Sequence, residues 1–150
     1  MKGQAEYLQI FMRIRFDTNI ILDVLLDRVP FSEHAADLMS KVERSEIDGL
    51  LCATTVTTIH YLLSKFLDKE EAIKSINSLM ALFEVASVNR LVIENALKAK
   101  FTDFEDSVLH ESARHAGAEY IVTRNIKGFK KSEIPAFTPT EFLSMLETLG

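Results

Sequence analysis

The sequence predicts an α/β fold in three layers, with a central, mostly parallel sheet of four to five strands between two layers of helices. Short apolar segments alternate along the chain with longer segments whose apolar residues recur every three to four positions. That alternation is typical of strands followed by helices in a parallel sheet. The 150 residues are a one-domain length, and five Gly and three Pro leave little room for a long linker. We therefore expect a single domain over residues 1–150.

Period-two alternation indicates the first strand, over residues 10–16, where Ile10, Met12, Ile14 and Phe16 alternate with Phe11, Arg13 and Arg15. Further strands are expected at 50–53, 83–88 and 120–123, with a very short one at 136–137. Residues 1–9 are polar, and Met12 would also serve as a start. Residues 1–11 are therefore a candidate for a flexible N-terminal extension.

Helices are expected between these strands, at 18–26, 32–45, 55–66, 69–82, 90–100, 103–117 and from 139 onward. Capping residues mark several of their ends. Asp17 or Thr18 is expected to cap the first helix, and Thr54 or Thr55 the third. Gly117 suits the end of the helix that Asp103 begins.

The composition limits the classes of function. A net charge of −5 counts against a protein that simply coats nucleic-acid duplexes, but not against a nuclease, whose metal-binding carboxylates lower the net charge. The single Cys52 cannot form an internal disulfide. The start lacks the apolar run of a signal peptide, and no stretch reaches the roughly 20 apolar residues of a membrane span. We expect a cytoplasmic protein that does not enter a membrane.

Acidic residues occur near the carboxyl ends of the expected strands, where α/β folds bind their ligands. Asp17 directly follows the first strand, and ligands bind outside the carboxyl ends of parallel strands. Asp103 and Asp106 are three residues apart and so share one helix face, whereas Glu105 points elsewhere and is expected to be solvated. A bound divalent cation would neutralise the like charges on that face. The alternative interpretation is that Asp17 and Asp103 are helix caps, the latter in a capping box.

A third polar position is Asn125, two residues beyond the fourth expected strand. It is either a turn residue or an oxygen ligand for a hard cation. The surrounding loop holds four basic residues. Arg124 and Lys127 are candidates for contacts to RNA phosphates. Lys130 and Lys131 are more readily interpreted as part of a solvated loop.

Taken in order, these motifs resemble a PIN domain, the fold of many prokaryotic toxin ribonucleases of the VapC type. The resemblance covers the chain from Met12 onward. It is carried by Asp17-Thr18-Asn19, by Asp103-x-x-Asp106-Ser107, and by Tyr120-Ile-Val-Thr-Arg-Asn125-x-x-x-Phe129. The resemblance implies a cluster of carboxylates that binds one or two Mg²⁺ or Mn²⁺ ions and hydrolyses RNA phosphodiesters. It also implies a cognate antitoxin partner and a homodimer.

By motif position, the resemblance makes Asp17 and Asp106 the main metal ligands and Asp103 an accessory acid. Asn125 stands at the last acidic position, where many members have Asp. The supporting residues of the loops would be Thr18, Asn19 and Thr123.

His60 is the second departure from the family pattern, because it stands where the family usually has Glu. It is interpreted either as a half-buried helix histidine or as a residue of the site. Neutral residues at positions 60 and 125 supply fewer negative charges, so we expect a lower metal affinity.

The leading hypothesis is therefore a metal-dependent endoribonuclease, the toxin of a toxin–antitoxin pair. The alternative is a catalytically weakened PIN-like module that binds RNA or a protein partner. A phosphatase of the haloacid dehalogenase type also begins with Asp after the first strand. It would need a second Asp at position 19, where this chain has Asn19.

Overall fold

The computed structural model describes residues 12–149, which contain a five-stranded sheet in the order β3-β2-β1-β4-β5. The strands are β1 (Arg13–Phe16), β2 (Asp48–Cys52), β3 (Glu84–Ala86), β4 (Tyr120–Val122) and β5 (Ala136–Phe137). All neighbouring strands pair in parallel. This confirms the predicted α/β fold class. The expected extension over residues 1–11, and the part of the first strand before Met12, lie outside the described residues.

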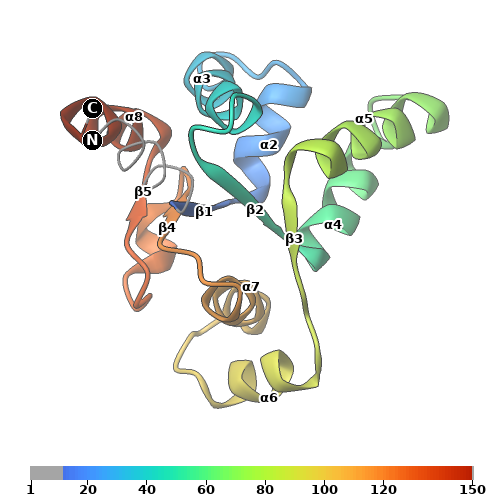
Figure 1. Cartoon of the computed structure of the whole chain (residues 1–150). Coiled ribbons are helices and arrows are strands. Elements are labelled where there is room, and N and C mark those ends of the chain that lie inside the picture. Colours follow the sequence, from blue (N-terminus) through green and yellow to red (C-terminus); the bar gives the residue numbers. More distant parts are fainter. Residues whose placement is uncertain (1–11, 150) are drawn as a thin grey trace.

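Helices cover both faces of the sheet (Figure 1). They are α2 (Thr18–Leu25), α3 (Ser32–Glu43), α4 (Ala53–Leu63), α5 (Lys69–Leu82), α6 (Arg90–Lys98), α7 (Phe104–His115) and α8 (Pro139–Leu149), with a short 3-10 helix, η1 (Ile126–Phe129). Figure 1 shows α2 and α3 on one side of the sheet and α6 and α7 on the other. The central strand β1 is therefore covered on both faces.

Three predicted helix starts are confirmed by side chains that cap them. Asp17, Asn89 and Asp103 each accept a hydrogen bond from a backbone N–H in the first turn of the helix that follows. The predicted end of α7 is confirmed too, since Gly117 has a φ of 79°, in the left-handed region that suits glycine.

The start of α4 differs from the prediction. Its N-cap is Cys52, which makes no side-chain cap hydrogen bond, and the helix begins at Ala53. Thr54 and Thr55 therefore lie inside the first turn. Strand β2 runs into the helix without a connecting residue, which moves the start of the helix ahead of the threonines.

The two faces of β1 differ in chemistry. Ile14 and Phe16 point into the main apolar core, which they share with α2, α3 and α8. Arg15 points to the opposite face. Its neighbour in register on β4, Ile121, packs against Ala113 of α7 and Phe129 of η1. Arg15 is thus buried on the face of β1 that α7 and η1 cover, whereas Arg13 on the same face stays partly exposed.

Candidate acidic site at the carboxyl edge of the sheet

Asp17 is fixed at the junction of β1, β4 and α2. Its backbone N–H donates to the carbonyl of Val122 at 3.0 Å, so the end of β1 is held to the end of β4. Its Oδ1 accepts from the Thr18 N–H and from Arg15 Nη2, both at 3.1 Å, and its Oδ2 accepts from Thr123 Oγ1 at 2.8 Å. Asp17 is therefore a helix cap and, at the same time, a carboxylate held in one orientation at the sheet edge.

Asp103 and Asp106 lie together at the start of α7. Asp103 is the N-cap, and its Oδ1 accepts from the Asp106 N–H at 2.9 Å. Burial raises the pKa of Asp106 above its ordinary value, and the negative charges of Asp103, Asp17 and Glu105 raise it further, while Arg15 opposes them. The charge of Asp17 therefore acts on Asp106, an acid far along the sequence. Glu105 is exposed, as expected.

These acids do not form a closed metal cage. Within residues 12–149, no three His, Cys, Asp or Glu side chains lie close enough to form a ligand set. Mg²⁺, however, is commonly held by only one or two carboxylates, with water and substrate phosphate completing its shell. Across the same residues, the Asp106 carboxylate accepts no hydrogen bond, so its oxygens are available. The donor set fits a hard divalent cation bound at an open site.

Thr123 connects the acidic site to the loop after β4. Its buried hydroxyl donates to Asp17 and accepts from the Asn125 N–H at 3.0 Å. The side-chain amide of Asn125 lies over Gly128, where a Cβ atom would come within 2.9 Å of Asn125 Nδ2. Asn125 is therefore held beside the site by the turn that η1 forms, and its part in binding a cation stays a prediction.

Arg124 is held in a buried ion-pair network that sequence reasoning missed. The carboxylate of Asp23, which is 0% exposed, lies 2.9 Å from Arg28 Nε and 2.9 Å from Arg124 Nε. The guanidinium of Arg124 also stacks on Phe31, 3.9 Å from the ring centroid. Arg28 Nη2 in turn donates to the backbone and side-chain oxygens of Asn19. The guanidinium of Arg124 therefore joins the loop after β4 to α2, which leaves it poorly placed to bind a phosphate.

The sequence carried a signal for this network. Asp23 interrupts a run of apolar residues in α2, and Ile20, Ile21, Leu22 and Asp23 are all buried. A charge within such a run requires a buried partner. Arg28, in the turn directly after α2, lies near Asp23 in the sequence, but Arg124 comes from the distant loop after β4, and spacing along the chain does not reveal it.

His60 is not connected to the acids. It is half-buried on α4, and its Nε2 is buried without a hydrogen-bond partner among residues 12–149. No hydrogen bond or ion pair within that range joins His60 to Asp17, Asp103 or Asp106.

A pocket of about 280 Å³ adjoins the acids, between the start of α7 and the loop that contains η1. It is lined by Phe101, Thr102, Asp103, Asp106, Lys127, Gly128, Lys130 and Lys131. Three lysines thus face two aspartates. The aspartates could bind a divalent cation, and the lysines could contact phosphate oxygens. The pocket therefore suits the backbone of a nucleic acid.

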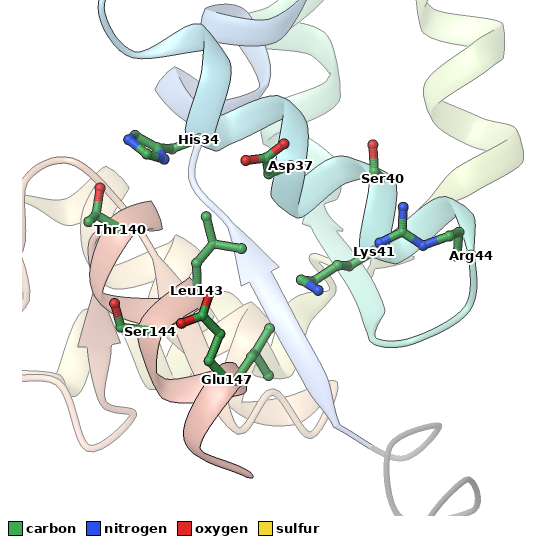
Figure 2. A pocket seen from close by; sticks show the side chains of 10 residues that line it. His34, Asp37, Ser40, Lys41, Arg44, Thr140, Leu143, Ser144 and Glu147 are labelled. Carbon is green, nitrogen blue, oxygen red and sulfur yellow. The ribbon is translucent and has the colours of Figure 1, made fainter. Parts of the chain in front are cut away.

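A larger cavity, of about 500 Å³, lies elsewhere (Figure 2). Figure 2 shows that its lining comes from α3, with His34, Asp37 and Lys41, and from α8, with Thr140 and Glu147. These helices cover the face of the sheet opposite α7. Size alone therefore does not identify the site, and the smaller pocket beside the acids is the better candidate for chemistry.

Asp106→Asn should stabilise the folded chain in metal-free buffer at neutral pH. The pKa of Asp106 is raised from its ordinary value of 3.8, so the ionised carboxylate is less favourable in the folded than in the unfolded state. The penalty is complete above the raised pKa and disappears as pH falls below the ordinary value. Urea unfolding followed by circular dichroism should show a gain at pH 7 that vanishes in acid. The exposed Glu105→Gln should change stability by less than about 0.5 kcal/mol. An equal gain for both variants would contradict the assignment.

The fold and the edge of acids define a class of α/β protein, and comparison with known proteins identifies it. The PIN domain family matches residues 13–127, and this chain belongs to that family. Ribonuclease VapC1 of Aquifex aeolicus (strain VF5) is 25% identical over 142 residues, which cover 91% of this chain and 97% of that protein.

Solved structures share the fold. VapBC2 from Rickettsia felis, bound to a DNA fragment from its promoter, aligns with a TM-score of 0.65 at 15% identity over 85% of this chain and 98% of that one. VapBC-1 from nontypeable Haemophilus influenzae aligns with a TM-score of 0.64 at 17% identity over 86% and 99%. The predicted resemblance to PIN domains is confirmed.

None of the helices between residues 12 and 149 combines the length and apolar character that a membrane span needs.

Proposed function

We propose that this protein is a metal-dependent endoribonuclease and the toxin of a toxin–antitoxin pair. The observation that carries the proposal is the pocket in which Asp103 and Asp106 face three lysines, together with the electrostatic influence of Asp17 on Asp106. Membership of the PIN family and the likeness to Ribonuclease VapC1 support it.

Asp17 and Asp106 would hold a Mg²⁺ or Mn²⁺ ion, with Asp103 as an accessory acid. When bound, the ion supplies an activated water and stabilises negative charge on the phosphate. Asp17 is held ready for this role because Arg15, Thr18 and Thr123 fix both of its oxygens.

The lysines would orient the RNA. Lys127, Lys130 and Lys131 line the pocket beside Asp106, and all three are exposed. Phosphate contacts of this kind fix the register of a nucleic acid without reading its sequence. We therefore propose Lys127, Lys130 and Lys131 as the phosphate-binding residues, since the other sequence candidate, Arg124, is paired with Asp23.

The likeness to toxin–antitoxin complexes supports a protein partner, and we propose a cognate antitoxin and a homodimer. A ribonuclease of this kind would act in the cytoplasm, where its RNA substrates are.

RNA cleavage tests the proposal. With Mn²⁺ present and a panel of RNAs, Asp17→Asn and Asp106→Asn should each lower the cleavage rate about 100-fold or more, because each removes an anionic ligand worth several kcal/mol to the transition state. Glu105→Gln is the matched control, since it removes a neighbouring exposed acid and should retain near-full activity. Cleavage that survives both Asn substitutions would rule out this site.

The second candidate is a catalytically weakened module that binds RNA or a protein. Two observations favour it: within residues 12–149 no three acidic, His or Cys side chains form a ligand set, and no hydrogen bond or ion pair in that range joins His60 to the acids. Calorimetric titration with Mn²⁺ distinguishes the two functions. For the enzyme, we expect saturable binding that Asp17→Ala abolishes. No heat of binding at millimolar Mn²⁺ would instead favour the module.

A further inference from the structure

Arg15 is a charged side chain buried in the middle of the sheet. It lies on the central strand β1, and it is only 1% exposed. One nitrogen, Nη2, donates to Asp17 Oδ1 at 3.1 Å. The other two, Nε and Nη1, are buried and have no hydrogen-bond partner among residues 12–149. A buried charge with so few partners is costly, and its presence calls for an explanation.

The surroundings of Arg15 indicate a role in charge balance. The guanidinium carbon lies 5.6 Å from the centroid of the Phe129 ring, so η1 closes over it. The same guanidinium donates to the Asp17 carboxylate, so its charge is held within the acidic site.

A divalent ion at Asp17 would share its carboxylate with this guanidinium. The two cations would repel each other, and in a partly buried site that repulsion is weakly screened. Without an ion, the guanidinium supplies positive charge to the acids and keeps the Asp17 carboxylate in place.

We propose that Arg15 is a resident cation of the acidic site. It orients Asp17 when no metal is bound, and it lowers the affinity of the site for a divalent cation. This inference rests on the proposed metal-dependent function, and it assigns Arg15 a positioning role rather than a catalytic one.

Mn²⁺ binding, measured by calorimetry without RNA, tests the inference. Arg15→Met keeps an unbranched apolar side chain that replaces the aliphatic part of Arg15, and it removes the charge. We expect the Kd for Mn²⁺ to fall by about tenfold or more, because one repelling charge is removed from a partly desolvated site. Arg15→Lys keeps the charge and should bind Mn²⁺ with an affinity close to that of the wild type.

Arg13→Met is the matched control. Arg13 lies two residues earlier on the same face of β1, but it pairs with Glu84 at 2.7 Å instead of with the acids of the site. Its Kd for Mn²⁺ should match that of the wild type. An equal gain for Arg13→Met would show a general effect of net charge and would overturn the inference.

Thermal unfolding adds a readout that does not depend on activity. In EDTA, Arg15→Met should be less stable than the wild type, and Mn²⁺ should raise its Tm by more than that of the wild type, because the ion then supplies the missing positive charge. If the variant is unfolded in EDTA, recovery of native circular dichroism with Mn²⁺ supports the inference. Failure to fold at every Mn²⁺ concentration overturns it.

The remaining outcomes separate the inference from the proposed function. If the wild type binds Mn²⁺ and Arg15→Met binds it no more tightly, only the role of Arg15 is overturned. If no variant binds Mn²⁺ at millimolar concentration, both the inference and the metal-dependent function are overturned.

Discussion

Asp23→Ala should lower the free energy of unfolding by about 3–5 kcal/mol, since removing one partner of a buried ion pair leaves charge without compensation. Asp23 is fully buried in α2, and its carboxylate is the common partner of Arg28 and Arg124. Both guanidinium groups are about one third exposed and regain some hydration, so we expect the lower part of this range. Urea unfolding at neutral pH, followed by far-UV circular dichroism, measures the loss.

Asp27→Asn is the control for this substitution. Asp27 is an exposed acid in the turn after α2, with a φ of 46° that asparagine tolerates well. It should change stability by less than about 0.5 kcal/mol. If Asp23→Ala and Asp27→Asn changed the free energy of unfolding equally little, the ion pairs of Asp23 would not stabilise the fold. Arg124 would then be free to act as the phosphate contact that its sequence position predicts.

The ion pair also has a functional consequence. Arg124 lies between Thr123, which holds Asp17, and Asn125, which stands beside the site. Loosening Arg124 from Asp23 should therefore disturb the loop that fixes the acidic site. We expect Asp23→Ala to weaken Mn²⁺ binding even at temperatures where the chain remains folded.

The sequence predicted the helices and strands well because each carries a local signal. Helix α5 runs over Lys69–Leu82 as predicted, since acids and a cap begin it and apolar residues recur at helical spacing. The electrostatic influence of Asp17 on Asp106 could be expected from the general rule about strand ends and from the family resemblance. No spacing along the chain implies it.

The charges inside the fold were harder to predict. In β1, the alternation of apolar and charged residues correctly places Ile14 and Arg15 on opposite faces of the strand. It does not tell whether the face that carries Arg15 is exposed to solvent. In a three-layer fold the central strand is covered on both faces, so Arg15 becomes buried under η1. Asp23 was overlooked for a related reason: its two partners follow α2 or β4 in loops, and loops carry no periodicity that would place them.

Phe16→Ala should destabilise the fold by about 3–5 kcal/mol, the usual cost of removing a buried aromatic ring and leaving a cavity. Phe16 is the last residue of β1, it is 0% exposed, and its ring meets that of Phe83 edge to face with centroids 5.1 Å apart. Because its backbone leads directly into Asp17, a cavity here lies next to the support of the acidic site. Urea unfolding should show the loss of stability, and the Asp17-dependent binding of Mn²⁺ should weaken with it.

The same truncation at Phe66, which is 70% exposed, should cost less than about 0.5 kcal/mol and leave Mn²⁺ binding unchanged. Equal losses at the two positions would mean that the packing behind Asp17 contributes nothing special to stability. In that case, the hydrogen bonds from Thr18, Thr123 and Arg15 alone would account for the placement of its carboxylate.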